Sequence, residues 1–406
     1  MAAKNTEKTG KPPADGFVLR LSLFFGALFM VVGLHAPYFP VWLEWRGLTP
    51  GEIGVVLAAP LAVRIFFTPA VSLVADQSGD RRKVLRLLSW GTLLGFFLFF
   101  IADGFWATFA VAIVVALFWT SVMPVTEAVA MQGVRRAGHD YGRMRLWGSL
   151  TFIAASFLGG LALERWGGGS VLWLMIGAAA CVAVSAHLLP APVGKERLKA
   201  ATQPRRIRWS DASRLLRQPI FLLFLSSTGL VQGAHAIYYA FGTIHWQSQG
   251  IPAGIIGTLW AVGVIAEILL FLYSGRVVKA AGVTNLICLA AFAAVIRWVA
   301  TALSPPLWLL FIMQALHGLT FGAAHLAAVH FISDAVPEEK TGTAQGLYAS
   351  AGMGIFMGGA ILISGPLYSS FGGHAYFAMA VLGGISLFLA LLLGINWKGE
   401  NLLPGR

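Results

Sequence analysis

The sequence predicts an all-α integral membrane protein whose twelve transmembrane helices form two six-helix bundles. Hydrophobic residues make up 57% of the 406 positions and charged residues only 11%, whereas a soluble domain carries about 25% charged residues. The apolar residues gather in runs of roughly 20, the length that a helix needs to span a bilayer. One long polar segment separates six such runs from six others.

Turn-forming or charged residues separate the twelve runs, which are taken here in chain order. In the N-terminal half, residues 1–190, the expected spans are 17–43, 50–75, 84–102, 106–131, 143–164 and 170–190. In the C-terminal half, residues 219–406, they are 219–246, 252–275, 284–303, 307–333, 341–369 and 374–396. The first run is too long for a signal-peptide core and no small-residue cleavage site follows it, so we expect it to remain as a spanning helix.

The distribution of basic residues predicts the orientation. With both termini in the cytoplasm, 24 of the 29 Lys and Arg residues face the cytoplasm and only Arg46 and Arg165 face the other side. Segment 191–218 is then a basic cytoplasmic linker between the two bundles. This bias follows the positive-inside rule, so the net charge of +12 indicates topology against anionic lipids and not nucleic acid binding.

Five charged residues fall well inside the apolar runs: Arg64, Glu127, Arg145, Glu267 and Arg297. Each would cost about 2.5–3.5 kcal/mol near the centre of a lipid-exposed helix. We therefore expect them to face a bundle interior or a hydrated cavity, where such charges usually serve function. The alternative is that they join helices structurally.

The depths of these charges suggest two clusters. At 1.5 Å per residue, Glu127 lies about 10 Å and Arg145 about 4–6 Å from the inner ends of their helices, which would allow an ion pair. Glu267, Arg297 and His317 share a second level, where a carboxylate, a guanidinium and an imidazole could form a proton relay with help from His325.

Other polar groups in the spans are candidate ligands. His235, Tyr238 and Tyr239 lie deep enough in 219–246 to line a cavity. His317 and His325 are about 12 Å apart along one helix, and His330 is rotated by about 140° from His325, so they do not predict a shared metal. The sequence shows no nucleophile elbow, zinc-protease motif or phosphate loop, so we expect neither an enzyme nor a cofactor other than the coupling proton.

Several motifs resemble known transporters. Residues 37–43 (Pro-Tyr-Phe-Pro-Val-Trp-Leu) and 47–54 resemble the branch of the major facilitator superfamily that contains lactose permease. Residues 76–83 are similar to the superfamily's motif between helices 2 and 3, although Ser72 stands where its leading Gly is usual. Residues 140–149 (Asp-Tyr-Gly-Arg-Met-Arg-Leu-Trp-Gly-Ser), taken with Gln232 to Tyr239, Glu267, Arg297-Trp298 and the histidines at 317 and 325, closely resemble the 3-phenylpropionic acid transporter family.

That resemblance implies the major facilitator fold and a monomer in the bacterial cytoplasmic membrane that imports small aromatic carboxylates with protons. Glu127 and Arg145 match the sugar-binding pair of lactose permease, and Glu267, Arg297 and His317 match its coupling network. Two positions depart from the permease's pattern. Thr320 stands where the permease has its proton-accepting Glu, and Gln314 replaces an intramembrane Lys.

Our leading hypothesis is a proton-coupled importer of an aromatic or hydrophobic monocarboxylate. Arg64 and Arg145 would hold the carboxylate, because a guanidinium binds it bidentately. Trp147, Tyr238 or Trp260 would pack against the ring, while Glu267 or Glu127 carries the proton. The loop residues Asp76, Arg81 and Arg82 would latch the cytoplasmic face. The alternatives are a sugar or nucleoside symporter with the same cavity, and an exporter that works by proton antiport.

Overall fold

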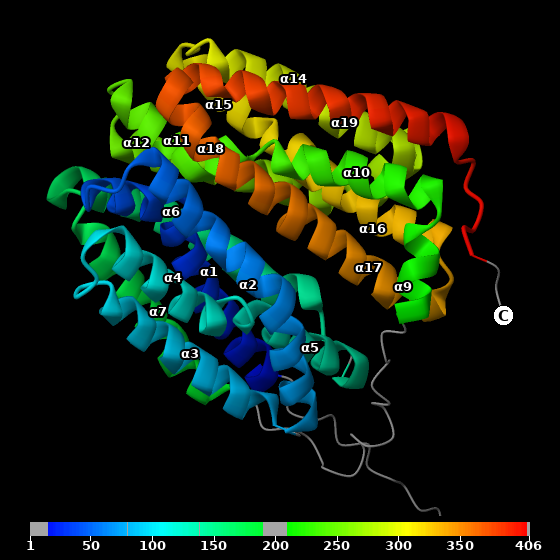
Figure 1. Ribbon diagram of the computed structural model, residues 1–406. Helices are drawn as coiled ribbons and strands as arrows, with labels where there is room; N and C mark the ends of the chain where they lie inside the picture. The colour runs from blue at the N-terminus through cyan, green and yellow to red at the C-terminus, as the bar shows by residue number, and fades with distance from the viewer. Residues whose placement is uncertain (1–14, 79, 138, 190–208, 404–406) are drawn as a thin grey trace, which may run out of the picture.

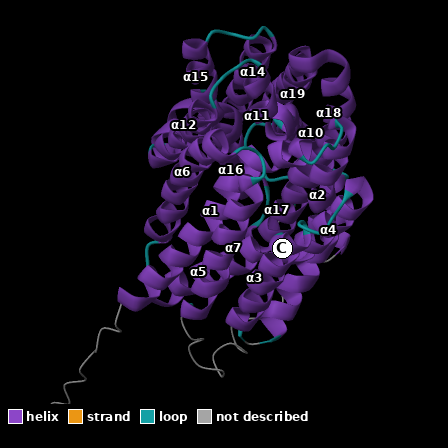
Figure 2. Cartoon of the chain, turned by 90° about the vertical axis from the view of Figure 1, so that its left-hand side faces the viewer, coloured by secondary structure: helices purple, strands orange, loops and turns teal. Residues whose placement is uncertain are grey.

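Inside a bilayer, the backbone N–H and C=O groups of a long apolar segment find no water to hydrogen-bond. A helix satisfies these groups within the segment itself, so such segments are expected to be helical. The computed structural model describes residues 15–78, 80–137, 139–189 and 209–403, and this part of the chain is helical with short loops (Figures 1 and 2). Most of the predicted linker 191–218 and the three N-terminal lysines lie outside the described residues. The last part of this linker forms the short helix α9.

The helices fall into two groups, which Figure 1 shows side by side. The N-terminal group consists of α1 (Asp15–Trp45), α2 (Pro50–Gln77), α3 (Arg81–Leu98), α4 (Gly104–Trp119), α5 (Val122–Ala137), α6 (Tyr141–Trp166) and α7 (Ser170–Leu188).

The C-terminal group runs from residue 209 to residue 396. It consists of α9 (Trp209–Leu216), α10 (Pro219–Gly233), α11 (Ala236–Ser248), α12 (Ala253–Leu272), α13 (Ser274–Ala281), α14 (Val283–Ala302), α15 (Leu307–Ala315), η1 (Gly318–Ala323), α16 (Ala324–Ala335), η2 (Glu338–Lys340), α17 (Thr341–Ala349), η3 (Ser350–Phe356), α18 (Met357–Phe371), η4 (Gly372–Ala375) and α19 (Tyr376–Asn396).

Ten helical stretches in the described part of the chain are long and apolar enough to cross a membrane. One of them, Glu338–Asn396, covers 59 residues and contains α17, α18 and α19, which is more than one crossing needs. Helix α3 is not among the ten, and four of its first six residues are Arg or Lys. The count of twelve crossings therefore stays a prediction.

Two of the predicted spans are interrupted by features of their own sequence. The span 106–131 divides into α4 and α5 at Thr120 and Ser121, because Pro124 has no amide hydrogen to donate to the carbonyl four residues earlier. The span 219–246 divides at Ala234 and His235. There the His235 Nδ1 hydrogen-bonds to the Val231 carbonyl (3.0 Å), which relieves the local break in the helix.

The two groups meet at one end of the molecule, which we call the closed end. It is formed by the last turns of α1 and α6 and the first turns of α2 and α12. Here α2 packs on α18 and α6 packs on α12. Glycines allow the close approach: a Cβ at Gly257 would overlap the Ser156 carbonyl, to which the Tyr38 hydroxyl also donates. Toward α5 and α9 the groups diverge (Figure 1).

One hydrogen bond at the closed end links the two groups through a helix terminus. Helix α12 starts at Pro252, which provides no side-chain cap. The Glu164 carboxylate of α6 accepts the Gly254 amide instead (3.1 Å) and so caps α12 from the opposite group.

Candidate functional site: an aromatic cavity and a buried ion network

A cavity of about 520 Å³ lies within the N-terminal group. Helices α1 to α5 form its walls, and Phe321 of η1 is its contact with the C-terminal group. Its lining is mostly apolar and includes six large aromatic side chains: Phe29, Phe39, Phe96, Phe99, Trp119 and Phe321. The polar side chains on the wall are His35, Arg64 and Thr120.

Arg64 gives this cavity its charge. It is the only Arg or Lys among the described residues of the lining, and it sits midway along α2. Within the described ranges the Arg64 guanidinium makes no hydrogen bond or ion pair. Neither Glu127 nor a backbone carbonyl is therefore its partner. A free guanidinium in an apolar wall is suited to a carboxylate.

Arg145 packs against Phe29 of the cavity wall, but Glu127 and Arg145 do not form the expected ion pair. The Tyr141 hydroxyl donates to Glu127 Oε1 (2.9 Å). The Arg145 guanidinium instead lies 3.7 Å from the centroid of the Phe29 ring, and its Nη1 has no hydrogen-bond partner in the described structure. The prediction of a direct pair is wrong because Tyr141, one turn before Arg145, satisfies the carboxylate.

The C-terminal group contains a continuous buried network around Arg297. The side chain is fully buried, and its Nη1 donates to His317 Nδ1 (2.9 Å) and to Thr320 Oγ1 (3.0 Å). His317 Nε2 in turn lies 2.9 Å from Glu267 Oε1. The structure therefore brings together the three groups that the depth argument placed at one level.

Three residues that the sequence analysis named apart from this cluster complete the network. Arg297 Nη2 donates to Gln314 Oε1 (3.0 Å), and His235 Nε2 lies 3.0 Å from Thr320 Oγ1. Thr320 and Gln314 thus provide neutral hydrogen-bonding groups at the two positions where the pattern of lactose permease has a Glu and a Lys. No carboxylate lies within 4.0 Å of the Arg297 guanidinium in the described part of the chain.

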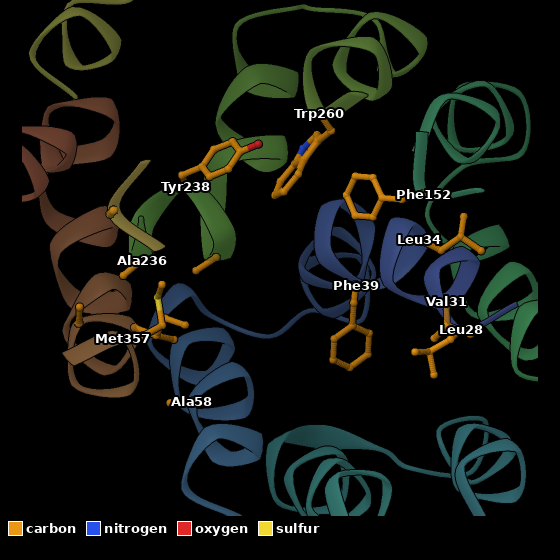
Figure 3. Close-up of a cluster of buried hydrophobic side chains, with 14 of the residues drawn as sticks. Leu28, Val31, Leu34, Phe39, Ala58, Phe152, Ala236, Tyr238, Trp260 and Met357 are labelled. Atoms are coloured by element: carbon orange, nitrogen blue, oxygen red, sulfur yellow. The ribbon is translucent and has the colours of Figure 1, made fainter. Parts of the chain in front are cut away.

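The predicted ring residues of α11 and α12 support this network. Tyr238 and Trp260 stack with centroids 4.4 Å apart, and Arg297 lies 4.9 Å from the Tyr238 ring. Both rings are buried, as is His235, while Tyr239 packs beside them. Figure 3 shows Trp260 lying toward Phe152 of α6, so the cluster continues into the N-terminal group. In this conformation these rings hold Arg297 and His317 in place and do not line the aromatic cavity.

The remaining predicted residues differ in their placement. His325 stacks on Phe321 (6.4 Å between centroids) and interacts electrostatically with Glu267 and Glu127, so it lies between the two clusters. Trp147 is 55% exposed and lines a surface groove with Leu19 and Leu188, away from the aromatic cavity. The structure thus gives no support to a contact between Trp147 and a substrate.

The proposed latch residues form local ion pairs. Arg81 Nη2 lies 2.7 Å from Asp76 Oδ1, and Arg82 Nε lies 3.1 Å from Asp80 Oδ1. The hydrogen bond from Arg82 holds the pKa of Asp80 below its ordinary value. Asp80 also caps α3 by accepting the Arg82 amide, so the pairs fix the turn between α2 and α3.

Comparisons with known proteins agree with this architecture. Residues 18–379 match the model of the MFS_1 like family. The chain is 31% identical to the probable 3-phenylpropionic acid transporter of Escherichia coli K12, with 91% of the chain and 96% of the relative aligned. It is 26% identical to the maltose permease of Geobacillus stearothermophilus, with 93% and 95% aligned.

Solved structures support the same fold. The crystal structure of the nucleoside transporter NupG superposes with a TM-score of 0.81 at 18% identity, covering 94% of this chain and all of that one. The family model spans most of the chain, and the curated relative is similar over nearly its full length. This protein therefore belongs to the MFS_1 like family, as a major facilitator transporter related to the 3-phenylpropionic acid transporters.

Proposed function

We propose that this transporter imports a small aromatic or hydrophobic carboxylate, such as 3-phenylpropionate, together with a proton by alternating access. The aromatic cavity with the free Arg64 guanidinium carries this proposal. Its volume of about 520 Å³ falls in the range of small-molecule sites, about 300–1,000 Å³. The arene would pack against Phe29, Phe39 and Trp119 while Arg64 takes the carboxylate.

The hydrogen bonds around Arg297 support an assignment of the proton carrier. A guanidinium can only donate, so His317 Nδ1 must accept from Arg297. The ring hydrogen of neutral His317 is then on Nε2 and is donated to Glu267 Oε1. Protonating His317 would place a hydrogen against Arg297, whereas the second oxygen of Glu267 can take a proton without breaking either bond. We therefore assign the transported proton to Glu267.

Coupling between proton and substrate would run through Arg145. Arg145 belongs to the N-terminal group but interacts electrostatically with Glu267 of the C-terminal group. Protonation of Glu267 removes a negative charge that attracts Arg145. The guanidinium then has a stronger preference for the incoming carboxylate, so proton and anion favour each other's binding.

The membrane arrangement that goes with this function has twelve crossings in two bundles of six, 1–190 and 219–406. The cytoplasm then holds both termini and the linker 191–218, and the closed end faces outward. The structure would accordingly represent an inward-facing conformation of a monomer in the bacterial inner membrane. In this arrangement Asp76, Arg81 and Arg82 lie on the cytoplasmic side, where they could latch the opposite conformation.

A sugar or nucleoside symporter is the second candidate. The Tyr141–Glu127 hydrogen bond and the unpartnered Arg145 Nη1 offer groups for hydroxyls, and a maltose permease is among the relatives. Neutral sugars or nucleosides would then compete for binding and carboxylates would not.

The direct test is uptake of labelled 3-phenylpropionate into proteoliposomes under an inward proton gradient. Accumulation that a protonophore abolishes would support the proposal. Arg64→Ala should abolish this uptake while the protein still reaches the membrane, and Arg276→Gln provides a matched control at a surface site over Tyr273. Unimpaired uptake by the Arg64→Ala variant would refute the role of Arg64.

A further inference from the structure

The aromatic cavity contains one polar side chain that neither the proposed carboxylate site nor the proton network uses. His35 of α1 lies on the wall of the cavity and is half-buried. Its ring stacks on Phe39, with centroids 4.7 Å apart and planes at 24°. This stacking fixes the plane of the imidazole but satisfies neither ring nitrogen.

The nitrogens of His35 have no protein partner in the described ranges. Among the described residues, the interaction that His35 makes is the ring contact with Phe39. By contrast, His235 and His317 each use both ring nitrogens in hydrogen bonds. Polar groups inside apolar walls are normally hydrogen-bonded, so the unused donor and the unused acceptor of His35 are available to a molecule bound in the cavity that this residue lines.

His35 and Arg64 lie at different levels along their helices. His35 lies ten residues before the end of α1 at Trp45, and Arg64 lies fourteen residues after the start of α2 at Pro50. At 1.5 Å per residue their backbones differ in level by about 6 Å, with His35 nearer to the closed end. This difference along the helix axes is comparable to the distance from the carboxylate of 3-phenylpropionate to the far edge of its ring, so one acid aligned with these axes could reach both levels.

We infer that the preferred substrate carries a hydroxyl group on its ring, and that His35 hydrogen-bonds this hydroxyl while Arg64 holds the carboxylate. The inference rests on the proposed function and narrows its substrate class from aromatic carboxylates to hydroxyaryl carboxylates. A phenol both donates and accepts, so it can bond to either nitrogen of the neutral imidazole. His35 is then a specificity residue, while Arg64 supplies the affinity common to the whole class.

The test compares 3-phenylpropionate with 3-(3-hydroxyphenyl)propionate and 3-(4-hydroxyphenyl)propionate as competitors for uptake by the wild-type protein. At least one hydroxylated acid should bind about two- to tenfold more tightly, the range of one neutral hydrogen bond. His35→Phe keeps a ring on Phe39 but removes both nitrogens, and it should abolish this preference among the three acids. His330→Phe, on α16 and outside the cavity lining, is the matched control and should keep the preference.

The outcomes separate this inference from the proposed function. Equal affinity of the wild-type protein for all three acids would overturn the role of His35 and leave the importer intact, and this result needs no variant to fold. A preference that survives in His35→Phe would overturn the inference as well. Competition by none of the acids would refute both the proposed function and the substrate class derived from it.

Discussion

Replacing Gly257 with alanine should open the closed end. The added Cβ would lie 2.8 Å from the Tyr38 hydroxyl oxygen and 3.0 Å from the Phe157 Cα, and it would overlap the Ser156 carbonyl. Comfortable contacts between carbon atoms are about 3.5–4.0 Å. Helices α6 and α12 would therefore have to separate by roughly 0.5–1 Å in a contact that exists only while this end is closed.

The size of the effect follows from overpacking. Inserting a methyl group into a well-packed contact costs about 1–3 kcal/mol, which here falls on the closed conformation. The equilibrium between closed and open forms should shift by about 5- to 150-fold toward the open one. The matched control is Gly384→Ala on α19, where a Cβ meets nothing within 4 Å and the change in helix propensity is the same.

Labelling of a buried cavity residue from the closed end measures this shift. Val56 is fully buried and lines the aromatic cavity, so Val56→Cys in a background without Cys181 and Cys288 reports access. A membrane-impermeant maleimide should label it faster in Gly257→Ala than in the parent or in Gly384→Ala. A lower Tm of Gly257→Ala with unchanged labelling would refute the reasoning, because the strain would then destabilise the fold and not one conformation.

Three further predictions test other parts of the molecule. Glu267→Gln should abolish accumulation driven by the proton gradient but retain exchange of substrate down its own gradient, measured by counterflow; full accumulation would exclude Glu267 as proton carrier. Trp147→Ala should leave the KM for uptake unchanged, because the ring lies in an exposed groove; a large rise in KM would place it at the substrate. Asp80→Asn should lower the Tm at pH 7. The lowered pKa of Asp80 means that its ionised carboxylate stabilises the fold at pH values above 3.8, the ordinary pKa of this group. The difference from the wild-type Tm should disappear as the pH falls below that value, and a difference that persists in acid would contradict the ion pair with Arg82.

The sequence predicted where helices lie along the chain and which residues share a level, because both depend on length along the chain. Helices occupy most of each predicted run, although several runs are interrupted, and Glu267, Arg297 and His317, placed at one level by residue counting, lie in a single chain of contacts. The constant rise of a helix makes depth a matter of arithmetic.

The direction in which a side chain points was much harder to predict. A helix packed against lipid on one face and protein on the other is apolar on both, so periodicity does not reveal the inner face. This is why Trp147 was expected at the substrate although it faces outward, and why His35 and Phe29 on the cavity wall were missed. The role of Tyr141 was also missed, because a tyrosine beside a predicted ion pair gives no signal that it will take the carboxylate.

The cap that Glu164 provides for α12 determines how reversible the closed end can be. Glu164 is exposed, and the amide that it accepts begins a helix whose own first residues offer no cap. When the groups separate, water can bond to both the carboxylate and the amide, so neither is left unsatisfied. The contact therefore favours one register of α6 on α12 while adding little to the barrier against opening. A transporter that cycles many times needs a contact of this kind, which aligns its two halves but does not trap either conformation.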